Sequence, residues 1–152
     1  MKKYLNLLLI LFCCLLLTGC KGKKEVLKCD GVSKQTNYTI STNYEIESRD
    51  NIVNKVIVKQ VIESKNKKIL TNFKKQLTNQ YKSNNSTYGG YKYDININGK
   101  KLTANVEIDY ESINLKRFIK DNSAMKDYVN KDNQFTLDGA KKLYESTGSK
   151  CE

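Results

Sequence analysis

Four carboxylates in the second half of the chain are the side chains best spaced for acid–base or cation chemistry. They are Asp94, Glu107, Asp109 and Glu111, and the last three occupy alternate positions. Carboxylates that share one face of a strand repel each other, which can raise the pKa of one of them towards that of a general acid. Their oxygens also suit a hard cation. Lys92 and Lys101 are expected on the same face, so an ordinary charged strand surface is the competing interpretation.

Other catalytic chemistries are excluded by composition. None of the 152 residues is histidine, which rules out a Ser-His-Asp triad, a Cys-His dyad and an imidazole metal ligand. No cofactor motif is visible, so we expect neither a cofactor nor a metal.

The N-terminus has the pattern of a processing signal. A short basic segment precedes an almost unbroken apolar run over residues 5–17, which is too short to span a bilayer. The closing Leu17-Thr18-Gly19-Cys20 resembles a bacterial lipobox, which implies cleavage between Gly19 and Cys20 and a diacylglycerol on Cys20. The alternatives are an ordinary secretory signal or a short buried helix. We expect a signal peptide at 1–19, a lipidated basic tether at 20–24 and one domain at 25–152.

The remaining cysteines are few. Cys13 and Cys14 lie in the apolar run, and Cys20 would carry lipid, so Cys29 and Cys151 remain, one near each end of the domain. An even pair outside the cytoplasm is a candidate disulfide. Two unpaired thiols are the alternative.

The positive charge is concentrated in one segment. The formal net charge is +11, and the stretch between Ser64 and Tyr93 contains seven lysines and no acid. On a helix, Lys68, Lys75 and Lys82 fall within about 40° of one another, opposite the apolar stripe. They are candidate contacts for anionic lipid or a phosphate-rich wall polymer. A solvated face in a lysine-rich chain is the alternative, and nucleic acid is not expected because the signal directs the domain out of the cytoplasm.

Alternation of apolar and polar residues predicts two β-hairpins. The first joins residues 38–47 to residues 52–62, and the second joins residues 91–97 to residues 102–110. Asn98-Gly99 is a favoured type I′ turn, and such a turn would place Ile95 opposite Leu102, Tyr93 opposite Ala104 and Tyr91 opposite Val106.

Helical periodicity predicts the other elements. Ser64 can cap a helix that runs to about Lys82, followed by a polar loop over residues 83–90. Short helices are expected around residues 113–119 and 125–129, and Thr136 can cap a last helix that stops at Gly148. The order predicts an α+β fold with an antiparallel β-sheet built from two hairpins, packed by the amphipathic helix between them and by short C-terminal helices.

Tyrosines around the second hairpin could bind sugar rings. Tyr81, Tyr91 and Tyr93 fall on faces predicted to be buried, so core packing is the competing interpretation for them. Tyr88, in the predicted loop, is the best candidate for an exposed contact.

The pattern as a whole resembles the YehR-like small bacterial lipoproteins. The resemblance covers roughly residues 25–150 and is carried by the lipobox, the hairpin that ends at residues 106–110, the amphipathic helix and the segment from Leu137 to Gly148. The chain departs from the family in Cys29, Cys151 and Ser149, which stands where an aromatic residue is expected. The resemblance implies an α+β surface lipoprotein of unknown function and supplies no catalytic residues.

Two functions follow from these patterns. The first is a non-enzymatic binding or interaction module, anchored to the membrane on its extracytoplasmic side. The second is a small envelope hydrolase that uses Asp94, Glu107 or Asp109. A convergent pocket around the carboxylates would favour the hydrolase, and an open sheet face would favour the binding module.

Overall fold

The computed structural model describes residues 22–152. Residues 1–21 lie outside this range, and with them the predicted signal peptide, the cleavage site at Gly19 and the lipidated Cys20. The elements are, in chain order, β1 (Lys24–Lys34), β2 (Thr39–Arg49), β3 (Ile52–Glu63), α2 (Lys67–Tyr88), β4 (Tyr91–Asn98), β5 (Lys101–Asp109), α3 (Leu115–Asp121), the 3-10 helix η1 (Ser123–Tyr128), α4 (Leu137–Ser146) and β6 (Lys150–Cys151).

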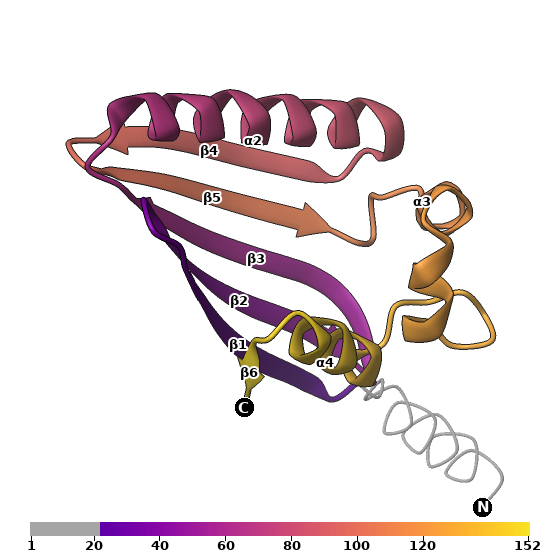
Figure 1. Ribbon diagram of the computed structural model, residues 1–152. Coiled ribbons are helices and arrows are strands. Elements are labelled where there is room, and N and C mark those ends of the chain that lie inside the picture. Colours follow the sequence, from indigo (N-terminus) through magenta and orange to yellow (C-terminus); the bar gives the residue numbers. More distant parts are fainter. Residues whose placement is uncertain (1–21) are drawn as a thin grey trace, which may run out of the picture.

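The strands form one six-stranded antiparallel sheet in the order β4-β5-β3-β2-β1-β6 (Figure 1). β3 pairs with β5 rather than with β4, so the two predicted hairpins join edge to edge. This arrangement confirms the predicted α+β class with an antiparallel sheet. Two strands were not predicted: β1, which completes a meander with β2 and β3, and the two-residue β6.

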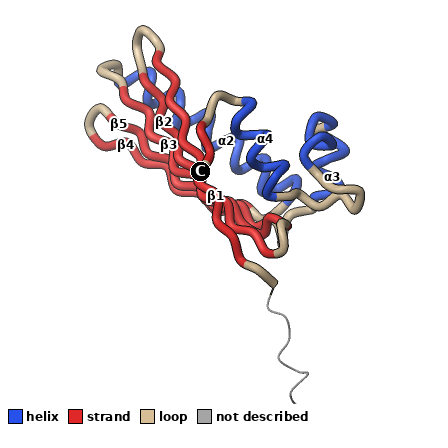
Figure 2. Tube along the Cα trace, turned by 90° about the horizontal axis from the view of Figure 1, so that it is seen from below, coloured by secondary structure: helices blue, strands red, loops and turns tan. Residues whose placement is uncertain are grey.

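Within residues 22–152, all helices cover the same face of the sheet, and none lies on the opposite face (Figure 2). α2 lies along β4 and β5, while α4 packs on β1, β2 and β3. We call the end of the sheet where β1 begins at Lys24 and β5 ends at Asp109 the near end. The far end is the one where β1 ends at Lys34, β3 ends at Glu63 and β5 begins at Lys101.

The core consists of two clusters that divide the sheet along its length. The larger cluster lies in the near half and is enclosed by α3, η1 and α4; its buried members are Cys29, Ile46, Val53, Val56, Val58, Tyr91, Val106, Ile113, Ile119, Met125, Phe135 and Ala140. The smaller cluster lies in the far half beneath α2; its buried members are Ile62, Leu70, Ile95, Leu102 and Ala104. The two halves therefore differ in how much buried surface holds them together.

β1 is difficult to recognise in the sequence because few of its inward-facing residues are apolar. The inward positions are Glu25, Leu27, Cys29 and Gly31, which pair with Ser48, Ile46, Tyr44 and Thr42 of β2. An acid and a glycine interrupt the alternation that normally reveals a strand. β1 begins at Lys24, the last residue of the predicted tether.

The predicted register of the second hairpin is wrong: each residue of β4 pairs with the β5 residue two positions beyond the predicted one. Ile95 lies opposite Ala104 rather than Leu102, because the turn is centred on Gly99 and Lys100, with Asn98 paired to Lys101. Gly99 has φ 59° and Lys100 does not have a positive φ, as expected for a type II′ turn rather than type I′. The same faces remain buried, because a shift of two residues preserves the alternation.

The predicted bounds of the long helix are also corrected. Asn66 is the N-cap: its side chain accepts a hydrogen bond from the Lys68 N–H at 2.9 Å. Ser64 lies just before this cap. The helix continues to Tyr88, so most of the predicted polar loop is helical and only Gly89 and Gly90 connect it to β4.

The last helix follows its prediction closely. Thr136 accepts a hydrogen bond from the Gly139 N–H at 3.0 Å and is the N-cap of α4. At the other end, the N–H groups of Gly148 and Ser149 donate to the carbonyls of Glu145 and Tyr144, which is a Schellman termination. α3 is capped by Asn114, and the helix expected around residues 125–129 is the 3-10 helix η1.

Candidate functional site

The outer side of α2 carries the predicted row of lysines. Lys68, Lys75 and Lys82 are all exposed, and they point away from Leu70, which is fully buried against the sheet. Successive members are seven residues apart, about 10.5 Å along the axis, so the row is about 21 Å long. The helix therefore presents a straight line of cations parallel to the strands.

These lysines have no acidic neighbours within the helix. α2 contains five lysines and no Asp or Glu, and among residues 22–152 no carboxylate lies within ion-pair distance of any of them. The ion pairs of the described residues involve other lysines and Arg117. The charge of the α2 row is thus available to an external anion.

The spaces between the lysines are filled by polar residues. Thr71, Asn72 and Asn79 are exposed on the same side of the helix. A helix that lies within a membrane interface needs an apolar outer face, and α2 buries its apolar stripe against the sheet instead. Within residues 22–152, no helix is long and apolar enough to cross a membrane.

Asp94, Glu107 and Asp109 lie on the open face of the sheet, and Glu111 lies in the turn after β5. Glu107 lies opposite Lys92 on β4, and their charged groups are 3.1 Å apart. Asp109 lies opposite Lys55 on β3, and Asp94 lies opposite Asn105. Opposite charges that face each other across strands stabilise a sheet. Asp94, Glu107 and Lys92 line a shallow depression that is open to solvent rather than an enclosed pocket.

Asp109 has the wrong electrostatics for a general acid. The Ser112 hydroxyl donates a hydrogen bond to Asp109 Oδ2 at 2.6 Å, and the Glu111 N–H donates to Oδ1 at 3.0 Å. The Ser112 contact is the largest cause that lowers the pKa of Asp109 below its ordinary value. A general acid at neutral pH needs a raised pKa. Asp109 instead builds the turn that follows β5.

The described residues do not form a metal centre from protein side chains. Within residues 22–152, no group of three or more Cys, Asp or Glu side chains is arranged to hold an ion. The carboxylates instead alternate with lysines and amides over five strands.

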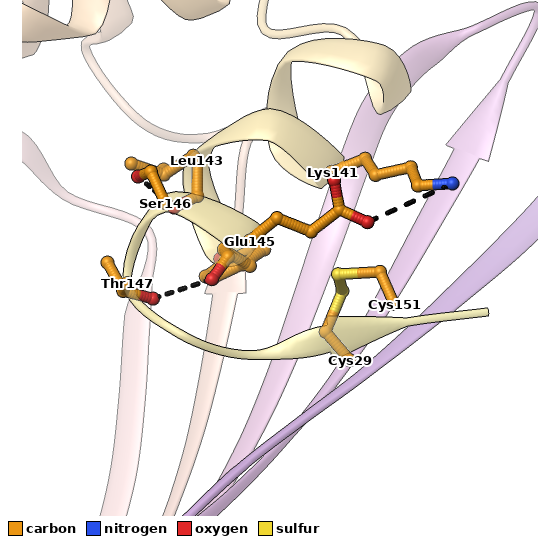
Figure 3. Close-up of a disulfide and its surroundings, with 8 residues drawn as sticks. Cys29, Lys141, Leu143, Glu145, Ser146, Thr147 and Cys151 are labelled. Carbon is orange, nitrogen blue, oxygen red and sulfur yellow. Dashed lines mark hydrogen bonds and ion pairs between the residues drawn. A yellow bond between two sulfur atoms is a disulfide. The ribbon is translucent and has the colours of Figure 1, made fainter.

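Cys29 and Cys151 are joined by a disulfide that holds the chain end on β1 (Figure 3). Beside it, Lys28 and Glu152 exchange backbone hydrogen bonds of 3.0 and 2.9 Å, which extends the pairing of β6. Gly31 lies close to Ser149 in this region: a Cβ at Gly31 would lie 2.8 Å from Ser149 Oγ, so the Ser149 side chain would have to move to accept one. The small serine that departs from the family pattern thus fits against a glycine of β1.

The tyrosines pack in the interior rather than forming a platform. Tyr81 and Tyr93 lie against each other with ring centroids 5.7 Å apart, and Tyr91 is only 7% exposed. The prediction that Tyr88 lies in an exposed loop is wrong: Tyr88 ends α2, and its ring packs edge-on against Phe118 at 5.1 Å. The Tyr88 hydroxyl donates to Asp121 at 3.3 Å.

A cavity at the far end of the sheet was not predicted. It has a volume of about 570 Å³ and is lined by residues 35–39, 63–66 and 100–101. These segments are the β1–β2 turn, the β3–α2 junction and the β4–β5 turn. In the sequence, Lys65 follows one predicted strand, and Lys100 and Lys101 precede another. These lysines indicate a common site only when β3 is known to pair with β5.

Comparisons with known proteins identify the fold. No protein-family model matches the sequence, and a search of curated proteins finds no significant match. The NMR structure of Escherichia coli YehR is similar with a TM-score of 0.55 and 18% identity, over 86% of this chain and 91% of YehR. The NMR structure of a protein from Streptococcus pneumoniae TIGR4 gives a TM-score of 0.50 and 9% identity, over 87% of each chain. The chain therefore has a YehR-like fold.

Proposed function

We propose that this chain is a lipoprotein of the YehR-like type, a non-enzymatic binding module held on the extracytoplasmic face of the cell membrane. Its cationic face, defined as Lys68, Lys75 and Lys82, binds an anionic partner at the envelope. The observation that carries this proposal is the row of exposed α2 lysines, which has no carboxylate beside it among the described residues. A row of like charges that is not compensated attracts polyanions.

The lipobox and the start of β1 support the anchoring. Only four residue steps separate Cys20 from Lys24, where β1 begins. Four extended residues span at most about 14 Å, so an acylated Cys20 would hold the near end of the sheet close to the bilayer. Two acyl chains give stable attachment, and Lys21, Lys23 and Lys24 would add attraction to anionic lipid.

The direction of α2 favours a polymer over the bilayer surface as the partner. α2 runs from the far end of the sheet to the near end, so its lysine row leads away from the tether. A polymer that extends outward from the membrane can follow such a row, whereas a flat bilayer near the tether meets only its Lys82 end. Lipid headgroups are the alternative partner, and the experiment compares their binding with that of the polymer.

The open sheet face supports a binding module over the hydrolase. Asp94 and Glu107 line one shallow depression that is open to solvent, Asp109 lies outside it, and Glu107 is paired with Lys92. The geometry of this face therefore favours the binding module.

The test measures binding of a soluble poly(glycerol phosphate) to the full chain in neutral detergent micelles, as a function of salt. We expect steep salt dependence, and the triple change Lys68→Gln, Lys75→Gln and Lys82→Gln to weaken binding roughly 100-fold, on the basis of about 1 kcal/mol per lysine. Micelles that contain phosphatidylglycerol provide the lipid comparison.

The matched control removes the same charge from the open sheet face. Lys28→Gln, Lys59→Gln and Lys92→Gln, made together, take three exposed lysines from strands β1, β3 and β4. We expect this variant to retain most of the affinity. Equal losses in the two triple variants, or binding that does not respond to salt, would contradict the proposal.

A further inference from the structure

The far-end cavity is a concave site built from three separate segments. Its walls are the turn after β1, the junction between β3 and α2, and the turn between β4 and β5, which meet where α2 begins (Figure 1). Its volume of about 570 Å³ falls within the range of small-molecule sites, roughly 300–1,000 Å³. It lies at the opposite end of the sheet from Lys24, so the proposed tether would leave it facing outward.

One buried serine holds the three walls together. Ser64 is only 7% exposed. Its hydroxyl donates to the Asn37 carbonyl at 2.8 Å and accepts from the Asn66 N–H at 3.1 Å, while its own N–H donates to the Lys100 carbonyl at 3.0 Å. These bonds connect all three segments, so the cavity is organised by the fold itself and does not need a ligand to bring its walls together.

The walls combine cations with neutral hydrogen-bonding groups. Lys65, Lys100 and Lys101 are all exposed at the cavity. Lys101 pairs with Glu63 at 2.7 Å, and among residues 22–152 no carboxylate lies within ion-pair distance of Lys65 or Lys100. The other polar lining groups are the side chains of Gln35, Thr36, Asn37, Thr39 and Asn66. The cavity is therefore net cationic and rich in amides and hydroxyls.

The aromatic part of the lining is fixed in place. Tyr38 belongs to the cavity wall, and its ring packs edge-on against Phe73 of α2 with centroids 5.1 Å apart. This contact orients the ring on a rigid support. A ligand in the cavity would thus meet one aromatic surface among otherwise polar groups.

We propose that this far-end pocket binds a phosphorylated polyol or sugar. The phosphate would be neutralised by Lys65 and Lys100, since ammonium groups bind phosphate as point charges. The ligand hydroxyls would exchange hydrogen bonds with the amides and threonines, and its carbon skeleton would lie against Tyr38. A purely apolar ligand does not match these walls, because it would leave their polar groups without partners.

The pocket is distinct from the cationic face and goes beyond the proposed function. Lys68, Lys75 and Lys82 are not among its lining residues. A discrete pocket recognises one small unit, whereas a row about 21 Å long attracts an extended polyanion. Variants of the two sites can therefore be tested separately.

The experiment follows backbone amide NMR signals of the full chain in neutral detergent micelles during titration with sn-glycerol 3-phosphate. We expect saturable shifts confined to residues 35–39, 63–66 and 98–101. Glycerol at the same concentration should produce none, and inorganic phosphate should bind at least threefold more weakly because it lacks the polyol. Shifts that map to the outer side of α2, or the absence of shifts at about 10 mM ligand, far above useful affinities, would overturn the inference.

Paired variants test the assigned residues. Lys65→Gln with Lys100→Gln should reduce the affinity for sn-glycerol 3-phosphate at least tenfold. Lys126→Gln with Lys131→Gln, which removes equal charge from exposed positions of the near half, should change it less than twofold. Equal effects of the two pairs of substitutions would contradict the inference. Binding only to phosphatidylglycerol micelles and not to the soluble ligand would also contradict it. Loss of polymer binding in the α2 triple variant with retained glycerol phosphate binding would separate this inference from the proposed function.

Discussion

The near and far halves of the sheet are built differently, although the same strands run through both. The near half has the larger core cluster, the disulfide and the cover of α3, η1 and α4. The far half has the smaller cluster beneath α2 and ends in two turns and the β3–α2 junction, which surround the far-end pocket. The stabilising features are therefore concentrated at one end, whereas the lysine-rich stretch that contains no acid begins at the other end and follows α2.

This difference suggests why the far half is suited to recognition. Buried lysines are costly unless they are paired, so cations that are meant to meet a partner must remain on a surface with little cover. The near half supplies the burial that keeps the fold stable. The far half then needs only enough packing to hold its turns in register, which Leu70 and Ser64 provide.

The largest expected effect comes from the centre of the near core. Phe135 is 1% exposed and packs beside Tyr110 with ring centroids 5.1 Å apart. Phe135→Ala should lower the free energy of unfolding by about 3 to 5 kcal/mol, because it removes a large buried ring and leaves a cavity. Chemical denaturation monitored by circular dichroism measures the loss.

Leu70→Ala is the matched change in the far core, since Leu70 is also fully buried. We expect a smaller loss, about 2 to 3 kcal/mol, with hydrogen exchange that accelerates mainly in α2 and the far turns. If Leu70→Ala destabilises the chain more than Phe135→Ala, the division into a stabilising near half and a lightly packed far half is wrong.

Removal of the disulfide should have an effect of similar size to that of Leu70→Ala. It closes a loop with a sequence separation of 122 residues, and Cys29→Ala with Cys151→Ala should cost about 2 to 4 kcal/mol. Mass analysis of the alkylated chain, with and without reductant, checks the bond itself. Alkylation of both Cys29 and Cys151 without reductant would show that the bond does not form. Amide signals of residues 35–39 and 63–66 should not move in the variant, because the far turns do not contact β6.

Local patterns were sufficient to predict the elements whose positions depend on neighbouring residues. The alternation in β2, β3, β4 and β5, the apolar stripe of α2 and the Thr136 cap are all encoded within about ten residues of sequence. Cross-strand and chain-end features are different. β6 has two residues and is linked to β1 by the Cys29–Cys151 bond, and β1 places Glu25 and Gly31 on its inward side.

The candidate sites divide in the same way. Helical spacing alone placed Lys68, Lys75 and Lys82 in one exposed row, because a helix fixes the angle between its residues. The far-end pocket depends instead on β3 pairing with β5, which brings Lys65 and Lys100 together from segments more than 30 residues apart. The turn around Gly99 was also shifted by one position. Sequence periodicity does not contain either of these facts.

High pH should act mainly on the near half. Burial raises the pKa of Tyr91 from 10.0 to about 12, with a smaller contribution from Tyr88, and it also raises the pKa values of Tyr110 and Tyr144. Below pH 10 both folded and unfolded states keep these protons, so the stability is fully present. Above pH 10 the unfolded state loses protons first, so stability should fall as the pH rises through 12. Thermal unfolding between pH 8 and 12 measures the decline.

Tyr91→Phe tests the contribution of one tyrosine to this decline. The variant should lose roughly 1 to 2 kcal/mol less stability than the parent between pH 10 and 12, while its stability below pH 10 shows any separate packing cost. Hydrogen exchange should report faster opening of the near half first as the pH rises. Earlier opening of α2 and the far turns would reverse the expected order.

The smallest expected effect concerns a compensated lysine on the open sheet face. Lys92 and Glu107 are 3.1 Å apart, but the Lys92 side chain is 81% exposed, so water screens the pair. A double-mutant cycle with Lys92→Gln and Glu107→Gln should give a coupling energy below about 0.5 kcal/mol. Lys92→Gln alone should change the affinity for poly(glycerol phosphate) less than twofold. Lys75→Gln should weaken it about fivefold, in line with about 1 kcal/mol for a lysine near an anionic surface. If the two single changes weaken polymer binding equally, the polymer responds only to the total charge of the chain, and the ion pair of Lys92 makes no difference to binding.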